Sequence, residues 1–201
     1  MKRILMLASL VVAMLVPASL MAQKSDKQLE KQAKKEAKDW VKKGWEVMPG
    51  SPSIQDQVFK RMKLQSQTLE DGSEKYVVET GTGTSQTRNA AKLVARQMAL
   101  VNIAQAIEAA VAGSVEGSIE SEQAFEKVKM GFASRFAKKL TNTISCVEMY
   151  KAEGNGFLAS ITIAYDKEEA IKAGVKAMRK ELEEETKALE AEAKTLLDQA
   201  K

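Results

Sequence analysis

Histidine is absent from the whole 201-residue sequence, and this absence excludes several kinds of catalytic chemistry. Without an imidazole, the chain has neither a Ser-His-Asp nor a Cys-His arrangement, and no zinc or iron site with histidine ligands. The one cysteine, Cys146, has no partner for an internal disulfide, and its place in an apolar run favours a small buried side chain. We therefore expect no enzyme and no metal centre.

Carboxylates are the remaining groups that could do chemistry, as the paired acids of a glycoside hydrolase. Acidic residues gather in two segments, 71–79 and 116–122. No pair of these acids is singled out by an aromatic platform for a sugar ring, and both tryptophans, Trp40 and Trp45, lie on the lysine-rich N-terminal segment. On an ideal helix, their spacing puts them about 140° apart, so we expect packing anchors rather than one flat stacking surface. A hydrolase is the least favoured function.

The glycine pair Gly81-x-Gly83 invites comparison with phosphate-binding loops. The third glycine of the dinucleotide fingerprint is missing, and no Gly-Lys-Ser/Thr follows. The pair is better explained by a tight turn from a strand into a helix, where glycines relieve crowding. Thr84, Ser85 or Thr87 can cap that helix. We expect no bound nucleotide. The acidic turn 153–155 offers too few oxygen ligands to bind calcium. No cofactor is expected.

The first 22 residues have the three-part layout of a secretory signal. A basic start at Lys2-Arg3 precedes an almost wholly apolar stretch, residues 4–16, and small residues lead to a polar segment. We place the cleavage between Ala22 and Gln23. An uncleaved anchor is the alternative, but the apolar stretch is shorter than the roughly 20 residues that span a membrane. No other segment is expected to cross a membrane, so the mature protein is assigned to the periplasm or the outer-membrane periphery.

The charge balance argues against nucleic acid as a partner. Of the 31 basic residues, Lys2 and Arg3 leave with the signal, so 29 remain against 27 acidic residues. A nearly neutral exported protein lacks the electrostatic footprint of nucleic-acid binding.

Hydrophobic periodicity and turn residues predict an α+β fold in the order β-α-α-β-β, with a long helix at each end. The sheet has three antiparallel strands and is packed by two core helices. The expected helices cover 24–47, 54–69, 86–112, 121–140 and 166 onward, and the expected strands cover 75–80, 143–151 and 156–165. Ser53 and Asp166 are expected to cap the second and the last of these helices. We divide the chain into a signal peptide (1–22), an N-terminal helical extension (23–70), a core domain (71–168) and a C-terminal helix (169–201).

The predicted core combines two helical stripes with one face of a hairpin. The stripes are Leu93, Leu100, Ala104, Ile107 and Val111 in the first core helix, and Phe125, Val128, Phe132, Phe136 and Leu140 in the second. The turn 153–156 is a hairpin signal, and its strands are expected to bury one face and leave the other partly wet.

The middle of the chain resembles a family of small bacterial envelope lipoproteins, which includes the flagellar-assembly lipoprotein P group. The resemblance rests on residues 76–83, on the alanine-rich run 89–99 and on the hairpin strand 157–165, within roughly residues 74–170. It implies a three-stranded sheet covered by two helices, with a non-catalytic role in envelope assembly. The chain departs from this family because no lipid-acceptor cysteine stands near the expected cleavage site.

The two terminal helices carry opposite charge and thin apolar stripes. Eight lysines face four acids over 24–43, whereas seven acids face four lysines from Lys180 onward. We expect these helices to pack against each other or against a partner's copies, and the alternative is that both are solvated extensions. The candidate contact residues are Trp40, Trp45, Leu189 and Leu196.

Besides the least favoured hydrolase, two functions remain open from the sequence. The first is an exported structural or interaction module, which binds an envelope protein or its own copies through the terminal helices or the sheet edge. The second is a periplasmic module for a small molecule or glycan, with a pocket beside Phe125 and Phe132. A peripheral contact between the lysine-rich helix and an anionic membrane stays open beside them.

Overall fold

A computed structural model describes residues 25–117 and 119–199 of the chain. The proposed signal and its cleavage junction, Ala22–Gln23, lie outside the described residues. The elements are α1 (Asp26–Lys42), α2 (Ile54–Gln65), β1 (Tyr76–Ser85), α3 (Arg88–Glu116), α4 (Glu122–Lys129), α5 (Phe132–Ala137), β2 (Ile144–Glu153), β3 (Gly156–Asp166) and α6 (Lys167–Gln199).

The predicted α+β fold with a three-stranded antiparallel sheet is confirmed. The strand order is β1-β3-β2, so the last strand in the sequence lies at the centre. Strands β2 and β3 form the predicted hairpin, in which Glu153 pairs with Gly156 and Gly154 adopts a left-handed φ of 56°. Two-residue hairpin loops favour such positive φ values, which glycine tolerates without steric cost.

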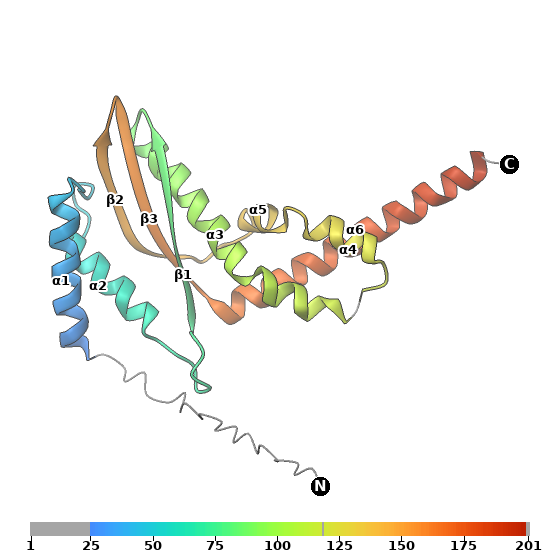
Figure 1. Cartoon of the computed structure of the whole chain (residues 1–201), viewed down its shortest axis with the longest axis horizontal. Helices are drawn as coiled ribbons and strands as arrows, with labels where there is room; N and C mark the ends of the chain where they lie inside the picture. Colours follow the sequence, from blue (N-terminus) through green and yellow to red (C-terminus); the bar gives the residue numbers. More distant parts are fainter. Residues whose placement is uncertain (1–24, 118, 200–201) are drawn as a thin grey trace, which may run out of the picture.

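Helices cover both faces of the sheet (Figure 1). Helix α3 lies on one face, while α1 and α2 lie on the other, where Ala33, Val58 and Val147 belong to one buried cluster. The expectation that one face of the hairpin stays partly wet is therefore wrong. Ser160 and Thr162, on the α2 side of β3, are only 4% and 3% exposed.

Strand β1 and helix α3 approach each other so closely that glycine is required between them. A Cβ atom on Gly81 would lie 2.1 Å from the backbone oxygen of Ala95 and 2.2 Å from the backbone nitrogen of Ala99. A Cβ atom on Gly83 would lie 2.7 Å from the backbone oxygen of Ala91. The predicted strand end at residue 80 is wrong, because these glycines continue the strand to Ser85 and do not form a loop.

Helix α3 runs from the sheet into a second, helical part of the core. Its alanines face β1, and further along Ile103, Ile107 and Val111 are buried against α5 and α6. Leu93, which we expected in the core stripe, is 70% exposed, because Ala91 and Ala95 take the sheet-facing positions. By length and composition alone, the helix of residues 88–116 is apolar enough to cross a membrane. This corrects our expectation that no segment after the signal is apolar enough to do so.

The expected helix 121–140 is two helices, α4 and α5. The break falls at Gly131, whose φ of 74° is left-handed and ends the helical path. Phe132 and Phe136, one turn apart in α5, form a parallel stack with ring centroids 5.4 Å apart. Both rings are at most 1% exposed, so the predicted phenylalanine core is confirmed even though the helix is interrupted.

Several helix ends follow the predicted capping residues. Ser53 accepts a hydrogen bond from the amide of Asp56, and Thr87 accepts one from the amide of Ala90. Asp166 accepts one from the amide of Glu169 and so caps α6. Helix α2 nevertheless ends at Gln65, short of the predicted residue 69.

The N-terminal helix is shorter than expected. It ends at Lys42, because Gly44 adopts a left-handed φ of 79°. Trp45 therefore lies outside the helix, and Glu46 pairs with Tyr150 along the outer edge of β2.

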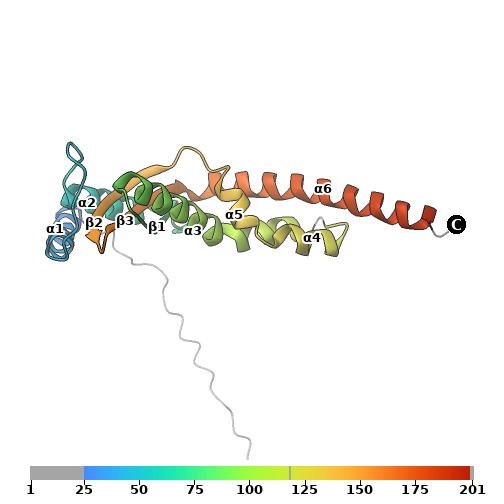
Figure 2. The same cartoon turned by 90° about the horizontal axis from the view of Figure 1, so that it is seen from above.

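Helix α6 begins beside the sheet and projects away from it, whereas α1 lies at the opposite end of the molecule (Figures 1 and 2). The two terminal helices do not pack against each other within the described chain. That part of the pairing hypothesis is wrong, while packing against another copy stays a prediction.

The glycine contact generates a stability prediction. Gly81→Ala and Gly83→Ala force a methyl group into the backbone of α3, and overpacking of this kind costs about 1–3 kcal/mol or more. Gly113→Ala is the matched control, because Gly113 lies in α3 with open space around it. Alanine should stabilise that helix by roughly 0.5–1 kcal/mol. Urea unfolding measures all three, and a neutral result for Gly81→Ala would contradict the close contact.

Candidate functional site

A shallow groove with a basic rim lies between α1 and the segment that leads into α2. Its volume is about 750 Å³. Its apolar floor includes Ala37, Val41, Trp45 and Ile54, and Val41 is 59% exposed. The groove therefore combines a largely buried apolar floor with one exposed apolar side chain, Val41.

Three lysines stand around this groove at one-turn intervals of α1. Lys34, Lys38 and Lys42 face a single lining carboxylate, Glu46. Within residues 25–117 and 119–199, none of the three lysines forms an ion pair, so their charge is open to a partner. We name this feature, with its apolar floor, the basic groove.

An ion pair between α1 and α2 holds the wall of the basic groove in place. The guanidinium of Arg61 donates two hydrogen bonds to Glu36, at 2.9 and 2.7 Å. The indole of Trp40 donates a third to the same carboxylate, at 3.0 Å. Burial opposes ionisation of Glu36, but these bonds outweigh it and lower its pKa.

The two tryptophans pack against each other at the end of the groove. Their rings meet edge to face, with centroids 5.4 Å apart and planes at 82°. The expected separation of about 140° assumed that both tryptophans lie on one helix. It does not apply, because Trp45 lies beyond the end of α1. Trp45 is 8% exposed and belongs to the core, so only a small part of it reaches the groove floor, whereas Trp40 is half-buried.

The second candidate surface is the outer part of α6, residues 183–199, which we name the acidic tail. Leu189 is half-buried and Leu196 is 60% exposed. They are seven residues apart and share one face of the helix, with Glu192 beside them and Glu190 on the opposite flank. The tail therefore carries a narrow apolar stripe bordered by carboxylates.

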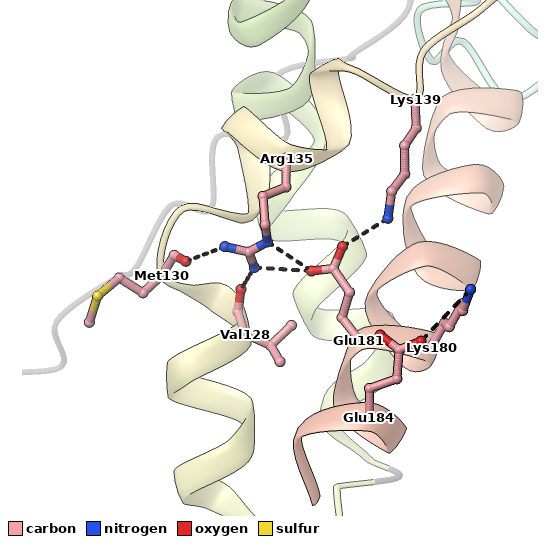
Figure 3. A network of polar contacts seen from close by, with 7 residues as sticks. All are labelled: Val128, Met130, Arg135, Lys139, Lys180, Glu181 and Glu184. Atoms are coloured by element: carbon pink, nitrogen blue, oxygen red, sulfur yellow. Dashed lines mark hydrogen bonds and ion pairs between the residues drawn. The ribbon is translucent and has the colours of Figure 1, made fainter. Parts of the chain in front are cut away.

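A polar network fixes the direction in which the acidic tail leaves the body (Figure 3). Glu181 of α6 accepts from Arg135 at 3.1 and 3.0 Å and from Lys139 at 2.9 Å. Arg135 also donates to the carbonyls of Val128 and Met130, which close the C-terminal end of α4. One guanidinium thus joins α4, α5 and α6.

A further ion pair continues this attachment along α6. Lys127 of α4 contacts Glu185, one turn beyond Glu181. Arg135 lies 46 residues before Glu181 in the sequence, so spacing rules along one helix could not reveal the network. Beyond these pairs, residues 190–196 are all exposed, and this outer part of the tail stands free.

A cavity of about 300 Å³ lies where the end of α3 meets α6. Its lining mixes apolar side chains such as Ile119 and Leu182 with the charged Glu120 and Arg179. The lining has no aromatic ring on which a sugar could stack. The space beside Phe132, where a ligand pocket was considered, is filled by the stacked ring of Phe136.

The two acidic segments considered for hydrolysis are not brought together into one site. The side chain of Ser73 and its backbone amide, which donates to Asp71 in a turn, lower the pKa of Asp71, and Glu79 lies on β1, where burial raises its pKa. Glu120 lines the α3–α6 cavity, and Glu122 begins α4. Across the described residues, no group of three or more Cys, Asp or Glu side chains is placed to hold a metal ion.

The outer edges of the sheet are partly occupied. On β1, the carbonyl of Thr80 accepts a hydrogen bond from Asn102 of α3 at 2.8 Å. On β2, the carbonyl of Ser145 accepts one from Lys60 at 2.7 Å. Such contacts reduce the number of free backbone groups available for strand addition, so the helical surfaces are the stronger candidates for a partner.

A bulge in β2 places Cys146 inside the protein. The register shifts between Ser145 and Val147, and Cys146 between them is 3% exposed. Burial raises the pKa of its thiol, so the expectation of a small buried side chain is confirmed.

Beside the bulge, Glu148 forms a polar link between the sheet and both helical layers. It pairs with Lys92 of α3 at 2.7 Å and accepts from Ser145 at 2.6 Å. Its backbone amide donates to Gln57 of α2 at 2.6 Å. Burial opposes ionisation, but the bonds from Lys92 and Ser145 outweigh it and lower the pKa of Glu148.

A scan against protein-family models, a search of the curated proteins and a search of the solved structures each found no match for this chain. The resemblance to envelope lipoproteins stays a prediction from the residues quoted above.

The Glu181 network predicts a local loss of stability. Glu181→Gln keeps the shape of a side chain that is 16% exposed but removes its charge from Arg135 and Lys139, so unfolding should need about 1–3 kcal/mol less. Hydrogen exchange of α6 amides should accelerate. Glu184→Gln is the control, because Glu184 is 66% exposed and pairs only with Lys180 at 3.8 Å. Equal effects of the two variants would refute the role of the network.

The lowered pKa of Glu148 predicts a pH dependence of stability. The ionised form is favoured by folding, so its contribution is complete above the ordinary glutamate pKa of about 4.3 and is lost as pH falls through the lowered pKa. The difference in unfolding free energy between the protein and Glu148→Gln should shrink over that acidic range. Urea titrations from pH 7 downward measure it, and a gap that stays constant down to the lowest pH would count against the ion pair with Lys92.

Proposed function

We propose that this protein is an exported, non-catalytic module of the cell envelope that acts through protein–protein contacts at its two ends. The observation that carries the proposal is the acidic tail, which the Glu181 network directs away from the body with Leu196 exposed. The outer turns of this helix, residues 190–196, are exposed and pack against no other described element of their own domain. They are suited to contact another molecule.

Two further features support an interaction module. The basic groove lies at the other end of the molecule and has an exposed apolar floor at Val41. Between the two ends, Glu148 and Glu181 take part in internal ion pairs. The envelope placement rests on the signal layout of residues 1–22 and on the resemblance over residues 74–170.

A ligand-binding module is the second candidate, favoured by the α3–α6 cavity. Its volume of about 300 Å³ is at the lower end for a small-molecule site. Its mixed charged lining suits a small zwitterion better than a glycan. The cavity adjoins the base of the acidic tail, since Glu183, Lys187 and Glu190 line it. A bound ligand would therefore act on the tail's attachment.

Expression of the full chain in a bacterium with two membranes tests the envelope placement. The protein should appear in the periplasmic or outer-membrane fraction with Gln23 as its N-terminal residue, measured by mass spectrometry after fractionation. A double variant, Val11→Asp with Val12→Asp, breaks the apolar stretch and should retain the precursor in the cytosol. An intact protein beginning at Met1 in the cytosol of the unmodified strain would overturn the proposal.

A further inference from the structure

We infer that the acidic tail of one copy docks into the basic groove of a second copy, so that the protein assembles head to tail. This inference rests on the proposed function as an interaction module and names the partner as the chain itself. Two complementary surfaces carry this inference. A lysine-rimmed apolar groove lies at one end of the molecule, and a leucine stripe bordered by carboxylates lies at the other.

The charges of the two surfaces are complementary. The groove presents Lys34, Lys38 and Lys42 from successive turns of α1, and the tail presents Glu190 and Glu192 on the two flanks of its stripe. Neither surface is neutralised by its own chain, because ion pairs of the described residues leave the three lysines and Glu192 unpaired. Opposite potentials orient two surfaces and exclude partners of like charge.

The apolar parts of the two surfaces also correspond. Val41 is 59% exposed on the groove floor, and Leu196 is 60% exposed on the tail. The free outer turns of the tail, residues 190–199, span about 15 Å, and α1, which has 17 residues, spans about 26 Å, so these turns can lie along the groove. Docking would remove both exposed side chains from water, which is the main favourable term in such an interface.

The geometry requires a second molecule. The tail points away from the body at one end, while α1 lies beyond the sheet at the other (Figures 1 and 2). The Arg135–Glu181 pair anchors the base of α6, so the tail does not fold back to its own groove. An interface between two different surfaces of one chain is heterologous, and unless its rotation closes a ring it produces an open series of copies.

Sedimentation velocity tests the inference on protein purified from cells that express the full chain. The average sedimentation coefficient should rise with protein concentration at about 0.05 M salt and fall back towards that of a monomer at about 0.5 M, because salt screens exposed charges. Val41→Glu and Leu196→Glu should each weaken association by at least about tenfold. Both residues are exposed, so circular dichroism should show an unchanged fold. Leu93→Glu, at a 70% exposed position outside both surfaces, is the control.

Mixing the two variants decides which surfaces meet. Val41→Glu keeps an intact tail and Leu196→Glu keeps an intact groove, so an equimolar mixture should form dimers and nothing larger. If two tails instead pair with each other, mixing should not restore association. A mixture that does not associate would therefore overturn the inference. The double exchange Lys38→Glu with Glu192→Lys should restore association that either change alone weakens.

Other outcomes separate this inference from the proposed function. A protein that stays monomeric at every concentration and salt, yet is recovered crosslinked to a different envelope protein, would overturn self-docking and leave the interaction module standing. A monomer that binds vesicles with anionic lipid but not neutral vesicles, and loses binding with Lys34→Glu and Lys38→Glu, would reassign the groove to a membrane surface and also overturn self-docking.

Discussion

The backbone contact between β1 and α3 is the constraint on which the rest of this structure depends. Gly81 and Gly83 allow the strand to touch the helix backbone at Ala95 and Ala99, where any larger residue would collide with main-chain atoms. Main-chain atoms cannot move aside as a side chain can, so the contact fixes both the height and the direction of α3 above the sheet. The second half of α3 then carries α5 and α6 away from the sheet, which places the acidic tail at the far end of the molecule.

Local signals in the sequence were enough to predict the α+β class, the hairpin and the caps at Ser53, Thr87 and Asp166, because each depends on residues only a few positions apart. Features that depend on distant contacts were not predicted. Gly81–Ser85 looked like a loop because glycine disfavours strands, and only the proximity of α3 explains its extended form. Leu93 was expected in the core because it fits the helical spacing of the apolar stripe, but the close approach of the strand favours the smaller side chains of the alanines.

The candidate site was predictable in its charge and not in its geometry. Opposite charge excesses on the two terminal helices are visible in the sequence, as are Leu189 and Leu196. The burial of Trp45 depends on the left-handed Gly44, which ends α1 before the tryptophan. The anchoring of α6 depends on Arg135, which reaches Glu181 across 46 residues and also closes the end of α4. The basic groove and the acidic tail are thus positioned by tertiary contacts, although their chemistry is local.

The most direct test of this account is carbodiimide crosslinking of a mixture of ¹⁴N- and ¹⁵N-labelled protein, read by mass spectrometry. This reagent joins a carboxylate to an amine only where the two are in contact, and the isotope labels separate bonds between copies from bonds within one. The account predicts mixed-label crosslinks that join Lys34, Lys38 or Lys42 to Glu190 or Glu192, on the opposed ends of two molecules. Crosslinks confined to single-label pairs, such as Lys187 with Glu183, would contradict it.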